Sequence, residues 1–435
     1  MKEKQVLKNA KWIIVCKLAQ SVLQLIIGMV SARYLGPSNY GLINYAASIV
    51  AFAMPLMKLG FDSILVYELV SEPAKEGEIM GTSLCLNMTS SVLCILGVLA
   101  FSAVTNRGNT ETIMVCVLYS LSVFFAAVEM IQYWFQYKLL SKYSSVVMLC
   151  AYVLVSTYKI FLLATQKNVY WFSIVHSVEF GVIGVALLIL YFKCKGQRFS
   201  FSVTCAKKLL ARSKHYILSS LMVVVIQNTD HIMITSMIGE VENGLYSAAI
   251  TCVTVCQFVY VAITDSFRPL ILSEKKENDP SYQNIVSRVY GITLYAAIVQ
   301  AVAFFVLADI IVHILYGNEY AGAVPLLRIL VFYFVFSVMG LVRNVWILAE
   351  EKQGYLWVIN LSGALLNVVL NAVMIPFCGA VGAATASLIT QCFTNFILGL
   401  IIKPLRPNTK LMFNGLRPKF MFSQIKLLLK EIRNR

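Results

Sequence analysis

Twelve apolar runs, each long enough to cross a lipid bilayer, dominate this sequence. A helix needs about 20 mainly apolar residues to span the hydrocarbon core of a membrane, and runs of that length recur along the whole chain. They occupy residues 11–33, 40–59, 80–104, 112–135, 144–165, 170–192, 215–238, 245–267, 287–316, 324–348, 355–376 and 382–402. The pattern predicts an all-α integral membrane protein with about 12 transmembrane helices.

The composition excludes a soluble protein. Of the 435 residues, 59% are hydrophobic and 13% are charged, whereas soluble domains are about 45–50% apolar and about 25% charged. The 11 cysteines are scattered without a C-x-x-C pair, which is typical of small packed hydrophobic residues rather than a disulfide framework. The first run follows basic residues, as a signal peptide does, but its length and the many similar runs after it favour a retained span.

The basic residues predict the orientation of the chain. With the N-terminus inside, 29 of the 36 Lys and Arg residues fall on inner segments and three on outer turns, with four inside spans. Cytoplasmic loops of membrane proteins carry such an excess, so we expect both termini in the cytoplasm. The same asymmetry explains the net charge of +15 without a nucleic-acid partner.

The predicted outer turns are too short to hold an external catalytic domain. They cover residues 34–39, 105–111, 166–169, 239–244, 317–323 and 377–381. The longest inner loops, 193–214 and 268–286, are basic. After residue 403 follows a basic tail with apolar residues at Phe420, Met421, Ile425, Leu428 and Leu429. Two interpretations of this tail stay open, an interfacial helix on anionic lipid and a solvated tail.

An internal repeat divides the sequence into two halves. The stretch "LGPSNYGL" at 35–42 matches "IGEVENGL" at 238–245, and "GFDS" at 60–63 matches "ITDS" at 263–266, both at an offset of 203 residues. Duplication of a six-span unit gives two parallel lobes, which is a plan typical of transporters. We therefore predict an N-terminal lobe at 1–200, a C-terminal lobe at 201–402 and a basic cytoplasmic tail at 403–435.

Ionisable residues inside the predicted spans are the candidate functional residues. Each costs at least about 2.5–3.5 kcal/mol at bilayer depth, so such residues usually face a water-filled cavity or the protein interior. They are Lys17, Glu129, Lys159, His176, Glu179, Asp230, His231, Asp309, His313, Arg328 and Arg343.

The cationic members of this set suit an anionic head group. Lys17 and Lys159 lie well inside their spans, where they would form a cationic cavity wall or pair with Glu129 or another span. For Arg343, a cavity role and snorkelling toward the interface are both open, and Arg328 is expected to snorkel. Asp230 is the deepest acid of the second half, so it needs a cation, a donor network or a role in proton coupling.

No motif for nucleotide binding or catalysis is present. The sequence has no G-x-x-x-x-G-K-[ST], H-E-x-x-H or G-x-S-x-G, and no His, Cys and carboxylate cluster has metal-ligand spacing. We therefore expect no enzyme, no cofactor and no metal site. The histidines in the spans are expected to be packing residues.

Four segments together resemble a polysaccharide-biosynthesis flippase of the multidrug/oligosaccharidyl-lipid/polysaccharide (MOP) exporter superfamily, the group that contains the Wzx-type O-antigen flippases. They are "ARYLGPSNYGLINYAASIV" at 32–50, "NTDHIMITSMIGEVENGLYSAA" at 228–249, "LYGNEYAGAVPLLRIL" at 315–330 and "LNVVLNAVMIPFCGAVGAATAS" at 366–387. They run in the family's order across nearly the whole chain.

The resemblance implies a substrate and a mechanism. Such proteins move undecaprenyl-diphosphate-linked sugar units across the bacterial cytoplasmic membrane by alternating access of two six-helix lobes, in O-antigen, capsule or exopolysaccharide biosynthesis. It implies that Lys17, Lys159 and Arg343 contact the diphosphate. By similarity to the related lipid II flippases, Asp230, Asn367, Asn371 and Ser387 are candidates for a coupling-ion site, with H⁺ or Na⁺ as the ion. An asparagine, Asn371, stands where an acid is expected, and the asparagines would also suit hydrogen bonds between helices.

Two other functions make different demands on the sequence. A drug/cation antiporter of the same superfamily should have an acid-rich N-lobe cavity, whereas the deepest charges of this half include Lys17 and Lys159. A membrane glycan polymerase or ligase should carry a long external loop, which the short outer turns do not provide. The flippase is the favoured function.

Overall fold

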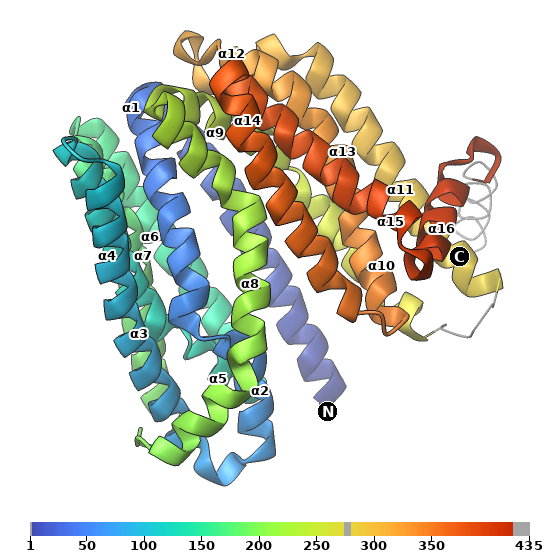
Figure 1. Cartoon of the computed structure of the whole chain (residues 1–435). Helices are drawn as coiled ribbons and strands as arrows, with labels where there is room; N and C mark the ends of the chain where they lie inside the picture. Colours follow the sequence, from blue (N-terminus) through green and yellow to red (C-terminus); the bar gives the residue numbers. More distant parts are fainter. Residues whose placement is uncertain (1, 274–279, 421–435) are drawn as a thin grey trace. The chain divides into compact units, whose positions relative to one another are not determined.

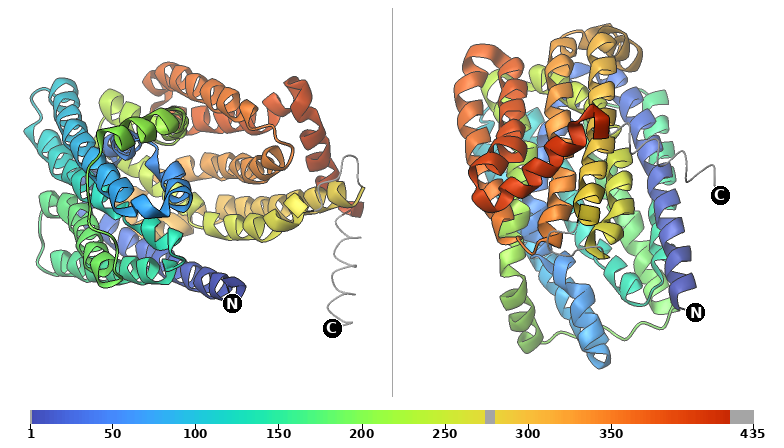
Figure 2. Two further views of the ribbon diagram at one scale, coloured as in Figure 1. Left: turned by 90° about the horizontal axis from the view of Figure 1, so that it is seen from below. Right: turned by 90° about the vertical axis from the view of Figure 1, so that its right-hand side faces the viewer.

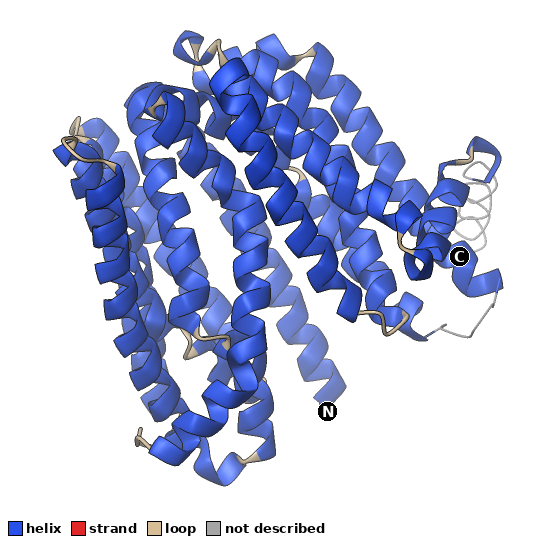
Figure 3. Ribbon diagram, in the orientation of Figure 1, coloured by secondary structure: helices blue, strands red, loops and turns tan. Residues whose placement is uncertain are grey.

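The structure is a computed structural model of the whole chain. It describes the backbone of residues 2–273 and 280–420, and within these ranges the side chains from Ala19 onward, apart from those of residues 215, 269, 273 and 280. The described part consists of helices and short connections, with no strand (Figure 3). This confirms the predicted all-α fold.

The chain divides into two compact units, Met1–Gly244 and Leu245–Arg435. In the first unit the helices are α1 (Lys2–Lys58), α2 (Phe61–Ser71), α3 (Glu76–Thr105), α4 (Thr110–Glu129), α5 (Gln132–Tyr137), α6 (Ser141–Ala164), α7 (Val169–Lys193) and α8 (Val203–Ile238) (Figure 1). Helix α9 (Glu240–Thr254) begins in the first unit and ends in the second.

The second unit holds the remaining helices and short helical turns. They are α10 (Gln257–Ser273), α11 (Pro280–Val306), α12 (Ala308–Tyr316), η2 (Asn318–Tyr320), α13 (Ala323–Ala349), α14 (Gly354–Cys392), the π-helical turn η3 (Phe393–Ile397), α15 (Leu398–Ile401), η4 (Lys403–Leu405) and α16 (Arg406–Leu416). The division at residue 244 reflects the packing of α8 against α1. The lobe boundary at 200/201 concerns a sequence duplication and stays a prediction.

Ten helical segments of the described residues are long and apolar enough to cross a membrane. The two longest, Ala19–Ser71 and Gly354–Ile401, each contain two of the predicted spans. A glycine with non-helical backbone interrupts each of them, Gly36 in the first and Gly379 in the second. At Gly36 the chain of α1 reverses direction (blue in Figure 1), so the ten segments provide the predicted twelve crossings.

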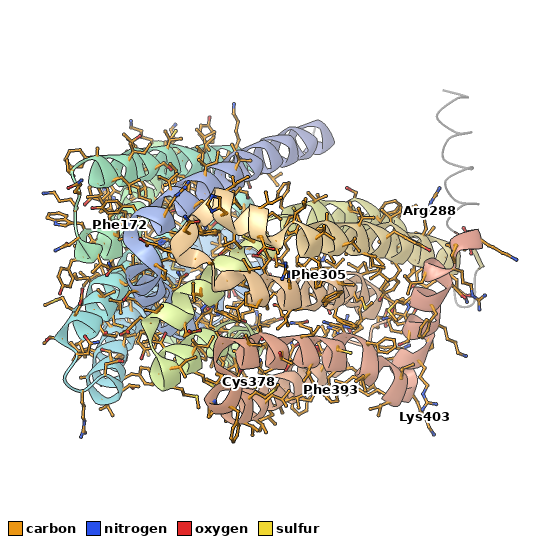
Figure 4. All side chains as sticks on the ribbon, turned by 90° about the horizontal axis from the view of Figure 1, so that it is seen from above. Phe172, Arg288, Phe305, Cys378, Phe393 and Lys403 are labelled. Atoms are coloured by element: carbon orange, nitrogen blue, oxygen red, sulfur yellow. The ribbon has the colours of Figure 1, made fainter. Side chains whose placement is uncertain are left out.

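The predicted outer turns of the first unit gather at one end of its helices. The Tyr34 hydroxyl donates to the Lys167 carbonyl (3.2 Å), and the Tyr34 ring stacks on Phe172 (5.9 Å; Phe172 is labelled in Figure 4). At the same end Asn106 donates to the Tyr45 hydroxyl (3.1 Å). The turns after the first, third and fifth predicted spans therefore lie together.

Two turns related by the 203-residue offset have the same backbone conformation. Gly36 has φ 71° and ψ 170°, and Gly239 has φ 107° and ψ 174°. Positive φ of this kind is strained for residues with a Cβ. Gly317, with φ 88° and ψ −178°, repeats the conformation a third time, and each of the three glycines is followed five residues later by another glycine. The repeat in sequence is thus a repeat in backbone geometry.

The second glycine of each turn lies against the backbone of the other turn. A Cβ placed on Gly41 would lie 1.8 Å from the carbonyl oxygen of Glu240, and one on Gly244 would lie 1.9 Å from that of Pro37. Glu240 and Pro37 are themselves related by the same offset, so the contact is reciprocal. Only glycine permits this close approach. Between the turns, buried Asn243 donates to the Gly41 carbonyl (2.8 Å).

The opposite end of the first unit is held by buried ion pairs. Glu68, 1% exposed, accepts from Lys208 (2.9 Å) and from Arg212. Glu76, 2% exposed, accepts from Lys138 (2.6 Å) and from the Trp134 indole (2.7 Å). A buried carboxylate needs such partners because an unpaired buried charge is strongly destabilising. These pairs fix the start of α8 to α2 and the start of α3 to the turn after α5.

The second unit contains part of the predicted tail. Helix α16 lies across α11 (Figure 2), and Gly415 is so close that an added Cβ would lie 2.3 Å from the Ser287 carbonyl oxygen. The Tyr290 hydroxyl donates to Asn408 (2.8 Å). Residues 406–416 are thus packed as a helix. The apolar tail positions 421, 425, 428 and 429 lie outside the described residues.

We expect Gly41→Ala and Gly244→Ala to destabilise the folded protein, because a methyl group at either position overlaps a carbonyl oxygen and overpacking costs about 1–3 kcal/mol. The measurement is the thermal unfolding midpoint of the detergent-solubilised protein. Gly97→Ala is the control, since no atom lies within 4 Å of its added Cβ and alanine is preferred to glycine in helices. Equal midpoints for the Gly41 and Gly97 variants would contradict the close contact.

Acid is expected to loosen the start of α8. Hydrogen bonds from Lys208 and Lys75 lower the pKa of Glu72 from 4.5 to about 2. A carboxyl with a lowered native pKa contributes stability above its ordinary pKa and loses it as the pH falls toward the native value. Hydrogen exchange of residues 203–212, corrected for intrinsic rates, should therefore accelerate between pH 4.5 and 2. The Glu72→Gln variant should lose part of this pH dependence of hydrogen exchange. If its exchange depended on pH as in the wild type, the attribution to Glu72 would be contradicted.

Candidate functional site

Of the two lysines predicted to form a cationic cavity wall, the structure describes the side chain of Lys159 but not that of Lys17. Lys17 belongs to the backbone of α1, but its side chain lies outside the described residues. Lys159 lies on α6, where it is half-buried. Its expected pairing with Glu129 or another span, and its place in a cationic wall, stay predictions.

A polar pocket lies within the first unit. It has a volume of about 300 Å³ and is lined by Gln20, Ser21 and Gln24 of α1, Tyr152 of α6, and His176, Glu179 and Phe180 of α7. We call it the α1–α6–α7 pocket. Tyr152 and Lys159 are seven residues apart on α6, which places them on the same face two turns apart. Polar side chains at this depth are costly unless they face water or protein, so the pocket is a candidate binding site.

Glu179 is the single carboxylate among the residues that line the pocket. His176 Nδ1 lies 3.4 Å from Glu179 Oε2, and the two residues are three apart on α7. The His176 ring also lies 5.0 Å from the ring of Tyr119, measured between centroids. The lining therefore combines one acid with an imidazole, amides and hydroxyls.

A larger cavity of the first unit has the opposite character. It has a volume of about 740 Å³ and lies between α1, α3 and α8. Its walls are apolar except for Ser90, Cys94 and Thr229, and the Ser90 hydroxyl already donates to the Leu56 carbonyl (3.0 Å). It offers nothing that would hold a charged or hydroxyl-rich group. The α1–α6–α7 pocket is the better candidate for a polar ligand.

Arg343 is buried in the second unit, at 6% exposure. Its guanidinium donates to the Thr394 carbonyl (2.8 Å), to Asn395 Oδ1 (2.7 Å) and to Asn344 Oδ1 (3.0 Å). Thr394 and Asn395 belong to the π-helical turn η3, which begins at Phe393 (labelled in Figure 4). All three acceptors are neutral, so the positive charge of Arg343 is not cancelled by them. Arg328 differs, because it pairs with Asp309 (2.6 Å) near the start of α12.

The four coupling-ion candidates fall in both units. Asn367, Asn371 and Ser387 are buried together in the second unit: Asn371 donates to Asn367 Oδ1 (3.2 Å), and Asn367 donates to Ser387 (3.5 Å). Asp230 is buried on α8 of the first unit. The structure thus joins three of the four residues by hydrogen bonds, across the hairpin of α14.

His231, next to Asp230, links the end of α8 to the paired turns. Its Nδ1 lies 2.7 Å from Asn243 Oδ1. Because the Asn243 amide nitrogen donates to Gly41, its oxygen accepts, and His231 Nδ1 must donate. Sequence analysis expected a packing histidine; the structure shows a hydrogen-bonded one.

Sequence analysis missed several polar residues of the first unit. Gln20 and Gln24 line the pocket, and the signal was available, because two glutamines four residues apart share one face of a helix. The buried acids Glu68 and Glu76 were missed because they lie beside the span boundaries, where charges are ordinary. Their burial depends on packing that hydropathy does not report.

Residues 6–273 match the family model described as polysaccharide biosynthesis protein. The chain belongs to this family. A curated relative, the capsular polysaccharide biosynthesis protein CapF of Staphylococcus aureus, is 20% identical over 390 residues, covering 88% of this chain and 96% of the relative.

Solved structures share the fold of this family member. The lipid II flippase MurJ in an inward closed conformation gives a TM-score of 0.68 at 15% identity, covering 93% of this chain and 90% of MurJ. An inward-facing multidrug resistance MATE transporter of the MOP superfamily gives 0.67 at 12% identity, covering 90% and 99%. The predicted MOP-type fold and polysaccharide family are confirmed. With ten helical segments among the described residues that are long and apolar enough to cross a membrane, the protein is a multi-pass membrane protein.

Proposed function

We propose that this protein is a lipid-linked oligosaccharide flippase that moves undecaprenyl-diphosphate-linked polysaccharide repeat units across the bacterial cytoplasmic membrane by alternating access. The observation that supports it most is a polar pocket in a member of a polysaccharide biosynthesis family, with Lys159 seven residues after the lining residue Tyr152 on α6. CapF, a relative over most of the chain, is a capsular polysaccharide biosynthesis protein. MurJ, which has the same fold, is a flippase of lipid II.

The basic residues of the spans are proposed to hold the diphosphate. Lys17 and Lys159 are the candidates of the first unit. Arg343 is the candidate of the second unit, taken by itself, because its hydrogen-bond acceptors are neutral. A phosphate oxygen that accepts from a charged donor forms a stronger hydrogen bond than one that accepts from a neutral donor. The lipid tail stays in the bilayer while the head group crosses.

The paired glycine turns are proposed to close the outer end of the protein in the conformation described here. Because their backbones touch at Gly41 and Gly244, no head group can pass between them. Alternating access then requires the turns to part, which breaks the bond from Asn243 to the Gly41 carbonyl. With both termini in the cytoplasm, as the distribution of basic residues predicts, this end faces outward.

The buried asparagines of α14 are proposed to bind the coupling ion, H⁺ or Na⁺, and Asp230 of the first unit is a separate candidate for this role. Amide and hydroxyl oxygens of Asn367, Asn371 and Ser387 are gathered in one place, and oxygen ligands suit a hard cation. Asp230 provides the only carboxylate of the four. The gradient of this ion, or the membrane potential, would drive the conformational change.

A drug/cation antiporter of the same superfamily is the alternative. An organic cation would be expected in a site rich in acids, whereas the α1–α6–α7 pocket has one acid, Glu179, among its seven lining residues. The amides and hydroxyls of the lining favour an uncharged ligand.

Lys159→Ala is expected to lower export of surface glycan by about 10- to 100-fold, because a hydrogen bond to a charged group contributes about 1.5–3 kcal/mol. The measurement is surface polysaccharide in a deletion strain that expresses the variant, together with lipid-linked intermediates that accumulate inside. Lys159→Arg should restore much of the export. Lys167→Ala, at the end of the first unit near Trp171, is the control. Normal export by the Lys159→Ala variant would exclude Lys159 from the head-group site.

Asn371→Ala is expected to remove the response of transport to an ion gradient. The measurement is flipping of the lipid-linked repeat unit in proteoliposomes with an imposed H⁺ or Na⁺ gradient and without one. Gradient-free exchange should persist, because the variant leaves the first unit unchanged. Thr385→Ala is the control, since Thr385 lies on the same hairpin, is only half-buried, and its hydroxyl is bonded to the Val381 carbonyl (2.8 Å). A gradient response equal to that of the wild type would rule out the proposed ion site.

A further inference from the structure

We infer that the α1–α6–α7 pocket is a subsite for an uncharged sugar of the transported substrate, separate from the position of the diphosphate. The inference rests on the proposed function. It assigns to Gln20, Ser21, Gln24 and Tyr152 the recognition of sugar hydroxyls.

The chemistry of the pocket wall matches a carbohydrate. Amides and hydroxyls both donate and accept hydrogen bonds, as sugar hydroxyls do, and four of the seven lining residues carry such groups. Phe180 adds an apolar face against which the C–H groups of a sugar ring can pack. Pockets with a few polar groups set in apolar walls are the usual form of small-molecule sites.

The polar groups of α1 are available for a ligand. Among the side chains that the structure describes, none is hydrogen-bonded to Gln20, Ser21 or Gln24. Polar groups at membrane depth are costly without partners. Gln24 is exposed and Gln20 and Ser21 are half-buried, so a ligand in the pocket can reach all three side chains.

The charges around the pocket restrict the kind of sugar. Glu179 borders it, at 15% side-chain exposure, and would repel an acidic sugar. His176 Nδ1 lies 3.4 Å from this carboxylate, and the amides and hydroxyls of the lining are uncharged. An uncharged sugar is the ligand that these walls fit.

The pocket also lies at a suitable place for a glycan joined to a diphosphate. Tyr152 and Lys159 are separated by seven residues of α6, about 10 Å along the helix. If the diphosphate lies at Lys159, sugars attached to it reach Tyr152 along the same face.

Binding to two lipid probes tests the subsite. The full-length protein in nanodiscs is titrated with undecaprenyl diphosphate, which has no sugar, and with the lipid-linked repeat unit purified from a strain that lacks the transporter. The double variant Gln20→Ala/Gln24→Ala should bind the repeat unit about tenfold more weakly, because two hydrogen bonds to hydroxyls are lost. Its affinity for undecaprenyl diphosphate should be unchanged, which also shows that it is folded.

Two further variants make the result specific. Val22→Ala, on the same turn of α1 but exposed at 50% and outside the pocket lining, should bind both probes like the wild type. Lys159→Ala should weaken the binding of both probes. Unchanged repeat-unit affinity in the double variant, or an equal loss for both probes, would overturn the subsite and leave the proposed function standing. If the wild type binds neither probe better than phosphatidylglycerol, the proposed function fails, and the subsite with it.

Discussion

The backbone contact between the turns at Gly36–Gly41 and Gly239–Gly244 determines much of the first unit. Two main chains can approach this closely only where neither residue has a Cβ, and both positions are glycine. The contact holds the end of α8 against α1, so that α8 belongs to the first compact unit. It also brings Asn243 between the Gly41 carbonyl and His231. The two copies of a repeated sequence motif thus pack against each other through equivalent backbone positions.

The second constraint is the cost of charge in lipid. At one end of the first unit, buried Glu68 and Glu76 each have a basic partner, as buried carboxylates require. At membrane depth the charges are fewer and less fully balanced: Glu179 lies beside His176, and Arg343 has only neutral acceptors. Charges retained under such conditions usually serve function. Lys159 and Arg343 are the cations of this kind among the described side chains that an anionic head group could use.

The sequence was sufficient to predict the spans but not their interruptions. Apolar length alone located the twelve crossings, since lipid demands helices with every backbone group paired. Hydropathy does not reveal an interruption of a helix such as the one at Leu307, between α11 and α12, because leucine is itself apolar. The grouping of Asn367, Asn371 and Ser387 followed from helix periodicity and resemblance. The α1–α6–α7 pocket did not, because it requires three helices to pack with their polar faces together.

Two cavities of the first unit differ in polarity, as the lipid and sugar parts of an amphipathic substrate do. The apolar cavity between α1, α3 and α8 has no charged lining residue, whereas the smaller pocket between α1, α6 and α7 is polar over much of its wall. A lipid-linked glycan has to leave its chain in an apolar medium while its sugars and diphosphate cross the membrane. Because the apolar cavity and the polar pocket are separate, sugar hydroxyls need not be placed against hydrocarbon, which would cost free energy. The basic residues can then hold the diphosphate, which joins the lipid to the sugars.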